Sequence, residues 1–366
     1  MKFGIVTVQN AVNFGAALQA YSLCANVRNF CDCDIIDYRN DSAVWGAMGA
    51  GLKNRLRRQM IKAMYTRRKA NFENFWENSG FISAETYPDR AALRNADSRY
   101  SAFIAGSDQI WNPPITGGDT SFFLDFVTGD ATRRLSYAAS FGSSAVVGAL
   151  HEGIIAHLGT YGALSVREPQ SAQALRNRLP SREIFSHIDP AFLTNDKQWA
   201  ALASKPPQGK YVLLYMMRSA DDLIEYAQEL ARSIDTRIYM LPVGLNRKPG
   251  IRYFTNAGPS EFLGLAMGAS HIITNSFHGA AFSLIFKKPF TIKFHLGQRN
   301  ANERFANLVS MFELEGRCLS DSHKPDFTYE PDFDLIDRRI KEQVSISTDY
   351  LRSLCGKTST DCAANA

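Results

Sequence analysis

The chain has 366 residues, of which 45% are hydrophobic and 21% charged, and its formal net charge at pH 7 is +5. This length predicts two domains of ordinary size, and the composition is that of a globular protein rather than a disordered chain. We expect a cytoplasmic protein, because no apolar run has transmembrane length and no signal-peptide pattern precedes the first strand-like segment. The modest positive charge favours anionic small molecules or an anionic membrane surface over nucleic acid, for which no motif is present.

The six cysteines do not follow the spacing of a zinc site or of a redox pair. One residue separates Cys31 from Cys33, and the other four are scattered along the chain. We therefore expect reduced thiols and no bound metal.

The chain opens with a β-α-β pattern. An apolar strand is predicted at residues 3–8, a helix at 16–27 and a second strand at 34–38, which implies parallel strands joined by a right-handed crossover. The intervening loop lies at the carboxyl end of the first strand, where open α/β sheets bind ligands. Its polar residues are therefore site candidates, with ordinary loop chemistry as the alternative: Asn13, Gly15 and Gln19.

Residues 44–69 are strongly basic and contain no acidic residue before Glu73. Apolar residues recur within this segment at helical spacing, so residues 52–69 form a candidate basic amphipathic helix. Such a helix can lie on anionic lipid at the inner face of a membrane, where each basic residue contributes roughly 1 kcal/mol. The alternative is a solvated helix with a basic outer face.

Two segments in the middle of the chain combine a strand with polar residues. The strand predicted at 100–105 runs into GSDQIW at 106–111, and this loop is a candidate pocket wall. Further strands are predicted at 135–141 and 163–166. Arg167 and Glu168 follow the last of these, and a purely structural ion pair explains them equally well.

The second half repeats the alternation of strands and helices after a linker at 204–209. Strands are predicted at 211–217, 237–243, 271–274 and 289–294, followed by a long helix at 334–354. The fold class is α/β, with two Rossmann-like domains at 1–203 and 204–330. A C-terminal helical segment at 331–355 and a disordered tail at 356–366 complete the prediction.

The segment IITNSFHGAAF at 272–282 predicts a strand, a tight turn and a helix with His278 on its first turn. A helix N-terminus attracts anions, and a histidine there can donate a proton to one. A histidine that merely caps the turn is the alternative. Arg218 also follows a predicted strand, so both residues are expected at one sheet edge, where an arginine can grip a carboxylate or phosphate with two hydrogen bonds.

In their order along the chain, several patches resemble the polysaccharide pyruvyl transferase family. They are NFGAALQ at 13–19, GSDQIW at 106–111, SVRE at 165–168, DPA at 189–191 and ITNSFHG at 273–279. The resemblance covers residues 4–294. It implies a GT-B-like pair of domains with the active site in the cleft. It also implies phosphoenolpyruvate as donor co-substrate, no further cofactor, and a sugar diol as acceptor, with a pyruvate ketal and phosphate as products.

The same resemblance assigns roles to individual residues. His278 is the expected general acid and Asp108 the expected base for the acceptor hydroxyl. Several family members carry an arginine two residues before this histidine, where the chain has Ser276, so Arg218 is the substitute donor ligand. The remaining donor candidates are Asn275, Ser276, Gly279, Lys293 and His295, and the acceptor candidates are Asn13, Gly15, Gln19, Gln109 and Trp111, whose ring is expected to stack on a sugar.

Two other functions fit the same fold. A GT-B nucleotide-sugar glycosyltransferase would bind its nucleotide in the second domain, with the ribose near Glu261. A non-catalytic protein that retains the fold is the other alternative, which Ser276 favours and His278 opposes. For the pyruvyl transferase, the expected acceptor is a sugar of a bacterial-type surface polysaccharide or its lipid-linked precursor.

Overall fold

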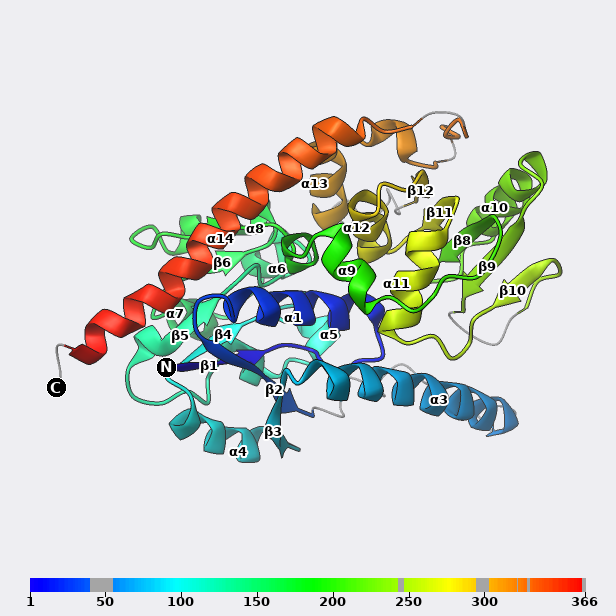
Figure 1. Cartoon of the computed structure of the whole chain (residues 1–366). Coiled ribbons are helices and arrows are strands. Elements are labelled where there is room, and N and C mark those ends of the chain that lie inside the picture. The colour runs from blue at the N-terminus through cyan, green and yellow to red at the C-terminus, as the bar shows by residue number, and fades with distance from the viewer. Residues whose placement is uncertain (40–54, 243–246, 294–302, 321, 328–329, 364–366) are drawn as a thin grey trace.

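The computed structural model describes residues 1–39, 55–242, 247–293, 303–320, 322–327 and 330–363, without the side chains of 55–65 and 357–363. The described chain forms two α/β halves, each built on a five-stranded sheet (Figure 1). α9 ends at Leu202 and β8 begins at Tyr211, so the predicted linker lies between the two sheets.

The first sheet is entirely parallel and has the order β3-β2-β1-β4-β5. Its strands are β1 (Lys2–Val6), β2 (Asp32–Tyr38), β3 (Ile82–Tyr87), β4 (Ala102–Ala105) and β5 (Arg134–Ser136). The helices of this half are α1 (Phe14–Val27), α3 (Arg55–Ser79), α4 (Arg90–Leu93), α5 (Pro113–Thr116), α6 (Ser144–Gly148), α7 (Glu152–Leu158), α8 (Pro169–Arg178) and α9 (Asp196–Leu202). A two-stranded ladder joins β6 (Ser165–Val166) to β7 (Phe185–Ser186). The predicted β-α-β opening is therefore confirmed.

The second sheet repeats this arrangement with the order β10-β9-β8-β11-β12, and all its described pairs are parallel. Its strands are β8 (Tyr211–Tyr215), β9 (Arg237–Leu241), β10 (Ile251–Tyr253), β11 (His271–Thr274) and β12 (Phe290–Ile292). The helices are α10 (Asp221–Ser233), α11 (Pro259–Gly268), α12 (Phe277–Ile285) and α13 (Glu303–Phe312). In both sheets the strand order reverses beside the first strand, and ligands bind at such switch points.

Short 3-10 helices complete the two halves. They are η2 (Arg94–Arg99), η3 (Thr120–Phe123), η4 (Ala131–Arg133), η5 (Pro190–Leu193) and η7 (Glu315–Arg317).

α1 lies at the boundary between the halves, which explains why none of its residues is exposed. Phe14 stacks on Phe262 of α11 with ring centroids 5.1 Å apart, and Tyr21 contacts Trp199 of α9 at 5.9 Å. Aromatic pairs at these distances add to the free energy of apolar burial. The start of α1 is thereby fixed against the second half.

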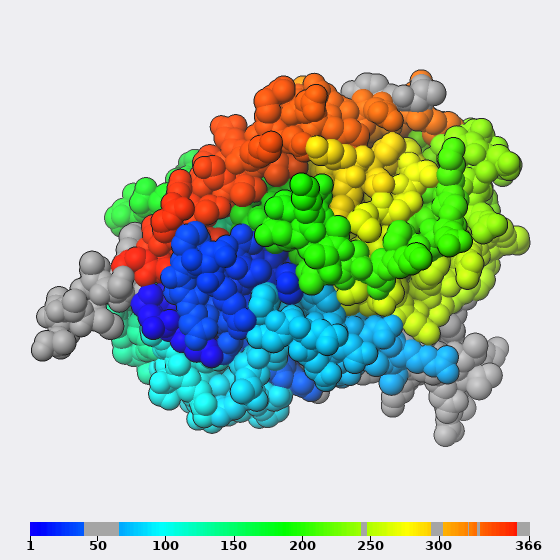
Figure 2. Space-filling model, viewed as in Figure 1, coloured from blue at the N-terminus to red at the C-terminus, as the bar shows by residue number. Residues whose placement is uncertain are grey.

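The last helix, α14 (Phe333–Ala363), returns the chain to the first half. It crosses the molecule as one long ridge (Figure 2). Tyr350 donates a hydrogen bond from its hydroxyl to the Ser136 carbonyl at 2.9 Å. The predicted helical segment is confirmed, and the helix continues to Ala363, past the end that the sequence predicts at residue 355. Extension of an established helix costs far less than its nucleation, so weak helix formers can continue it.

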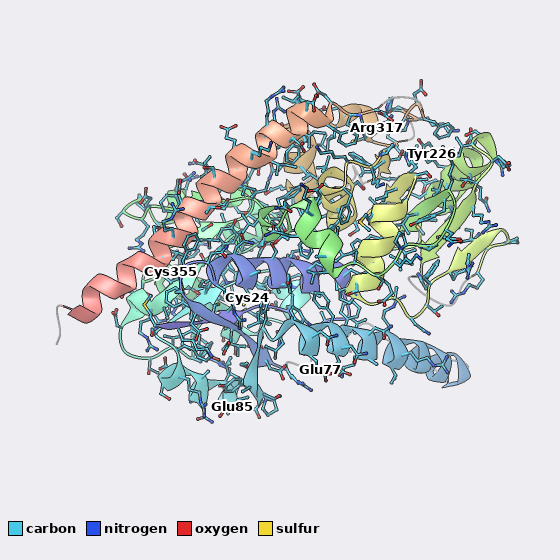
Figure 3. All side chains as sticks on the ribbon, viewed as in Figure 1. Cys24, Glu77, Glu85, Tyr226, Arg317 and Cys355 are labelled. Atoms are coloured by element: carbon cyan, nitrogen blue, oxygen red, sulfur yellow. A yellow bond between two sulfur atoms is a disulfide. The ribbon has the colours of Figure 1, made fainter. Side chains whose placement is uncertain are left out.

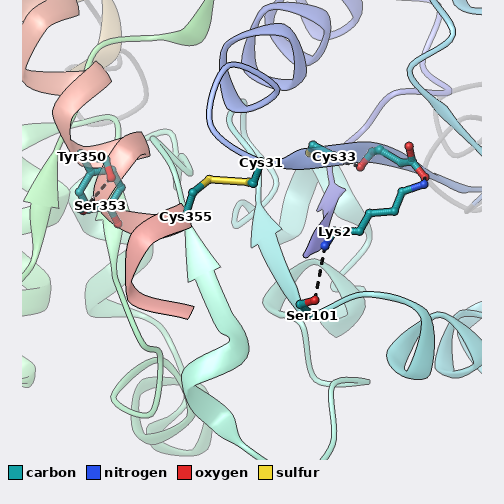
Figure 4. The surroundings of a disulfide bond; sticks show 8 residues. Lys2, Cys31, Cys33, Ser101, Tyr350, Ser353 and Cys355 are labelled. Carbon is teal, nitrogen blue, oxygen red and sulfur yellow. Dashed lines mark hydrogen bonds and ion pairs between the residues drawn. A yellow bond between two sulfur atoms is a disulfide. The ribbon is translucent and has the colours of Figure 1, made fainter. Parts of the chain in front are cut away.

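A disulfide between Cys31 and Cys355 joins the region after α1 to α14 (Figure 4). The two α-carbons are 6.0 Å apart although 324 residues separate the cysteines. The prediction of reduced thiols is therefore wrong for this pair, because only the tertiary fold brings these positions together. Cys24, Cys33 and Cys318 are free.

A buried polar cluster stabilises the far end of the second half, where Tyr226 and Arg317 lie (Figure 3). The Tyr226 hydroxyl is 3.0 Å from Thr291 Oγ1, and Arg317 donates to the Asp326 carbonyl at 2.7 Å. The first contact joins α10 to β12, and the second lies within the segment after α13.

Candidate active site

The loops at the carboxyl ends of both sheets meet where α1 and α12 begin. Gly15, on the first turn of α1, lies against the imidazole of His278, on the first turn of α12. A β-carbon on Gly15 would lie 2.0 Å from His278 Nδ1. The absence of a side chain at position 15 is therefore what allows the two helices to meet.

Local sequence explains how His278 is placed. The β-branched residues of β11 end at Thr274, and Ser276 caps α12 by accepting a hydrogen bond from Gly279 N at 3.3 Å. A β-carbon on Gly279 would lie 2.3 Å from Thr274 Oγ1. Ser276 and Gly279, predicted as donor ligands, thus hold the turn that carries His278.

His278 is 5% exposed and faces a buried carboxylate of the first half. Its Nε2 lies 3.4 Å from Asp189 Oδ2, within ion-pair distance but without the alignment of a hydrogen bond. Asp189 in turn caps η5 by accepting from Ala191 N at 3.0 Å. The histidine and its carboxylate partner therefore come from different halves of the chain.

Arg167 connects this pair to the rest of the site. Its Nη1 donates to Asp189 at 2.5 Å, its Nε lies 3.4 Å from Glu168, and its Nη2 lies 3.7 Å from Asp108. A continuous chain of charges thus runs from Asp108 through Arg167 and Asp189 to His278. The sequence left Arg167 and Glu168 open as a structural pair, and the structure places both at the centre of the site.

Opposite charges set the protonation of these groups. Burial alone would raise the pKa of Asp189, but His278 and then Arg167 hold it well below its usual range. Burial alone would lower the pKa of Arg167, but the negative charges of Asp189, Glu168 and Asp108 outweigh burial and raise this pKa above its ordinary value. Both groups are therefore charged at neutral pH.

A second arginine approaches the cluster from α13. Burial, followed by the positive charge of Arg167, lowers the pKa of Arg304. The Gln109 amide lies beside it and, with its oxygen facing the guanidinium, accepts from Arg304 Nη1 at 3.0 Å. The preceding residue, Glu303, accepts from Ser144 N at 2.8 Å and from Ser144 Oγ at 2.6 Å. These contacts tie α13 to the first half.

Several buried polar atoms of the cluster have no hydrogen-bond partner among the described residues. They are Arg167 Nη2, Arg304 Nε, His278 Nε2 and Glu168 Oε2. Unsatisfied polar atoms in a protein interior cost about 1–3 kcal/mol each, so their concentration here indicates a place where a ligand binds. Two guanidinium groups and an imidazole suit a ligand with several anionic oxygens.

The predicted acceptor residues occupy different environments. Asn13 caps α1 by accepting from Gly15 N at 3.0 Å, and Asp108 has a left-handed backbone with φ 68° in the loop after β4. Gln19 is fully buried and donates to the Ala16 carbonyl at 3.0 Å. The Trp111 ring is 0% exposed and stacks on Phe123, so it presents no face on which a sugar could stack.

The remaining predicted donor residues lie outside the cluster. The Arg218 side chain is exposed, and its carbonyl accepts a hydrogen bond from Asn275 Nδ2 at 2.9 Å. Asn275 also accepts from Met217 N at 2.7 Å and so links β11 to the loop after β8. Lys293 pairs with Asp222 of α10. His295 lies outside the described residues.

Sequence reasoning missed two members of the site. Arg304 belongs to no patch that the sequence singled out, and Asp189 was noted only as part of DPA at 189–191. The signal for Asp189 was its place beside a proline that starts a short helix. No signal in the sequence indicated Arg304.

Two Rossmann-like halves meet at a buried cluster of histidine and arginine side chains, and this arrangement is of the GT-B type. The polysaccharide pyruvyl transferase family model matches residues 13–292, and the chain belongs to this family. It is therefore an enzyme of that family, as the sequence predicts. No protein with a curated description matches the sequence.

Solved structures of low sequence identity are similar to the chain. The UDP-GlcNAc 2-epimerase of Methanocaldococcus jannaschii is 12% identical, with a TM-score of 0.50 over 94% of this chain and 93% of that chain. The UDP-GlcNAc 2-epimerase of Neisseria meningitidis, bound to UDP-GlcNAc, is 10% identical, with a TM-score of 0.47 over 97% and 94%. An Escherichia coli heptosyltransferase with ADP is 11% identical, with a TM-score of 0.41 over 83% and 90%. At this identity the first of these supports the fold alone.

None of the helices that the structure describes combines the length and the apolar character needed to cross a bilayer.

Proposed function

We propose that the enzyme transfers pyruvate from phosphoenolpyruvate onto two hydroxyls of a sugar, forming a cyclic ketal and releasing phosphate. The acceptor sugar belongs to a bacterial-type surface polysaccharide or to its lipid-linked precursor. The observation that carries the proposal is the contact of His278 with Asp189 beside two arginines. This arrangement joins a proton donor to an anion site.

The two arginines suit the donor because phosphoenolpyruvate carries a carboxylate and a phosphate. In this proposal Arg167 and Arg304 bind anionic oxygens of the donor, whose charge offsets the repulsion between the guanidinium groups. Arg218 contributes from the exposed edge of the second sheet. Lys293 can bind the donor only when its ion pair with Asp222 is broken.

The reaction begins with proton transfer from His278 to the terminal carbon of the enol phosphate. Positive charge develops at the carbon that carries the phosphate, and a sugar hydroxyl forms a C–O bond there as its proton passes to Asp108. The bond from this carbon to the phosphate oxygen then breaks. The second hydroxyl closes the ring, and its proton leaves with phosphate.

The geometry around His278 supports its role as the acid. Nε2 faces Asp189, which stabilises the protonated ring, and this nitrogen is the proposed proton donor because it has no hydrogen-bond partner among the described residues, whereas Gly15 covers Nδ1. Gln109 and Asn13 lie at the boundary and are the proposed acceptor contacts. Gln19 and Trp111 support the walls of the site from within.

Phosphate release with phosphoenolpyruvate and a panel of sugar acceptors tests the proposal. His278→Gln should lower turnover by about 10²- to 10⁴-fold, the usual contribution of a general acid. His323→Gln, a change at an exposed histidine, is the matched control. A His278 variant that retains more than about a tenth of wild-type turnover would remove the histidine from the mechanism.

Thermal unfolding separates the main alternative. A ligand at about 100 times its dissociation constant stabilises a protein by roughly 2.7 kcal/mol. Stabilisation by phosphoenolpyruvate and not by nucleotide sugars supports the pyruvyl transferase. Stabilisation by a nucleotide sugar alone would instead identify a glycosyltransferase.

Contact of residues 52–69 with anionic lipid is a separate part of the proposal. The predicted helix is present as α3, but residues 52–54 and the side chains of 55–65 lie outside the described part. Arg67 and Lys69 are exposed, whereas Arg68 faces the protein. Co-sedimentation that is equal with anionic and neutral liposomes would contradict this contact.

A further inference from the structure

A hollow of about 170 Å³ lies at the boundary between the halves, next to the start of α1. α1 and α3 form one side of it, and the carboxyl ends of β8 and β9 form the other. The residues that matter here are Phe14, Arg68, Tyr215, Met216, Leu241 and Pro242. The second sheet is thus open at the edge where parallel sheets bind ligands.

Among the described residues that line this pocket, Arg68 is the one with a charged side chain. Its guanidinium carbon lies 5.6 Å from the centroid of the Phe14 ring, and its Nε donates to the Thr255 carbonyl at 3.2 Å. Nη2 lies 3.4 Å from the Pro242 carbonyl. These contacts fix the plane of the guanidinium and leave further N–H donors for a ligand.

No carboxylate of the described residues neutralises the positive charge of Arg68. Its partners in these contacts are neutral carbonyl groups and an aromatic ring, and no ion pair joins it to a carboxylate of the described chain. Burial, together with the positive charge of Arg247, lowers the pKa of Arg68, although the group stays charged at neutral pH. A partly buried, uncompensated cation is stabilised by a bound anion.

Tyr215 adds a second donor. Burial raises its pKa to about 12, which keeps the hydroxyl protonated at neutral pH. The same hydroxyl donates to the sulfur of Met217 at 3.4 Å, and a thioether is a weak acceptor that an anion would replace. Arg68 and Tyr215 therefore offer hydrogen-bond donors, while Met216, Leu241 and Phe14 supply apolar walls.

We infer that this pocket is a substrate subsite that binds a carboxylate or phosphate group through Arg68 and Tyr215. The inference rests on the proposed function, because the pocket adjoins the proposed acid: Phe14 of its wall precedes Gly15, which touches His278. The anionic group belongs either to phosphoenolpyruvate or to a phosphate of the acceptor. Arg68 thus supplies a positive charge from the first half. Ser276, which stands where several family members carry an arginine, supplies none.

Calorimetric titration with two probes distinguishes these sources. Phosphoenolpyruvate represents the donor, and inorganic pyrophosphate represents an acceptor phosphate. Arg68→Gln should weaken the binding of one probe at least about 10-fold, since a hydrogen bond to a charged group is worth that much or more. Arg67→Gln removes the same charge from the adjacent exposed position and should change binding less than about twofold.

Each outcome has a definite meaning. Loss of phosphoenolpyruvate binding assigns the pocket to the donor, and loss of pyrophosphate binding alone assigns it to the acceptor. Arg68→Lys keeps the positive charge but loses the paired N–H donors of the guanidinium. Its affinity for the probe should lie between those of the wild type and Arg68→Gln. Unchanged binding of both probes, or no binding of either by the wild type, would overturn the inference.

The experiments distinguish a failure of the proposed subsite from a failure of the proposed function. His278-dependent phosphate release with unchanged binding in Arg68→Gln would leave the reaction standing and remove only the subsite. Conversely, a wild-type protein that binds pyrophosphate through Arg68 but never phosphoenolpyruvate would retain the pocket and contradict the donor. The unfolding temperature of each variant without ligand shows whether its fold is intact.

Discussion

The imidazole of His278 lies against the backbone of Gly15, although 263 positions (278 − 15) separate the two residues along the chain. Gly15 belongs to α1, which follows the first strand of the first sheet. His278 belongs to α12, which follows β11 of the second sheet. Through this contact the position of a proposed catalytic side chain depends on the packing of the two halves.

Gly15→Ala tests that dependence directly. The new β-carbon would lie 2.0 Å from His278 Nδ1, so the ring or a helix must move. We expect turnover to fall at least about 10-fold and the free energy of unfolding to fall by about 1–3 kcal/mol. Phosphate release and urea denaturation measure the two effects. Gly148→Ala, where an added β-carbon meets no atom within 4 Å, is the control.

Arg304→Gln removes the second guanidinium of the cluster and keeps a polar side chain. We expect phosphoenolpyruvate affinity to fall at least about 10-fold, because one charge-assisted contact to the donor is lost. Arg338→Gln, on the exposed side of α14, should bind the donor as the wild type does. Equal affinities in isothermal titration would exclude Arg304 from the donor site.

Stability should fall between pH 6.5 and pH 4 because of His187. Burial lowers the pKa of His187 to about 4, below the ordinary value of 6.5, so the unfolded chain takes up a proton first as the pH falls. The contribution of neutral His187 to the free energy of unfolding is complete above about pH 6.5. Below that pH it decreases by up to about 1.4 kcal/mol per pH unit. The free energy of unfolding, measured by urea denaturation across this range, should have a smaller slope against pH in His187→Gln than in the wild type.

Two features of this experiment make its result specific. Burial also lowers the pKa of His271, to about 3, so the slope should diminish in His187→Gln rather than vanish. His323→Gln alters an exposed histidine and should leave the slope unchanged. An identical slope in wild type and His187→Gln would contradict the prediction.

The Cys31–Cys355 disulfide should stabilise the fold by restricting the unfolded chain. Loss of a native disulfide typically costs about 2–5 kcal/mol. Reduction, or Cys355→Ser, should therefore lower the unfolding temperature, and reductant should have no further effect on the variant. Cys318→Ala, which alters a free thiol, should keep the response to reductant. An unfolding temperature that is the same with and without reductant would show that the bond does not form.

Local patterns explain which parts of the fold the sequence predicts. Ile272 and Ile273 are β-branched, Ser276 can cap a helix, and apolar residues follow at helical spacing, so the turn that carries His278 is legible from neighbours in the chain. The same reasoning identifies both β-α-β halves. β10, by contrast, has only three residues and is paired along one edge, which is too weak a pattern to detect.

The site depends on distant neighbours, and there the sequence is less informative. The Arg167 contact with Asp189 spans 22 positions, and Arg304 reaches Gln109 from the other half. Trp111 belongs to a loop that suits a pocket wall, yet its stacking on Phe123 places it in the core. Arg68 belongs to a run of basic residues, and only the tertiary structure distinguishes its inward direction from the exposed Arg67.

The return of α14 to the first half has a consequence for biosynthesis. Leu351 and Leu354 are 1% exposed and belong to the same apolar cluster as residues of α1, and Tyr350 bonds to the end of β5. Domains generally fold in the order in which the ribosome makes them. Here the half that emerges first lacks part of its core until α14 has left the exit tunnel, so its core is completed only after the second half has been made.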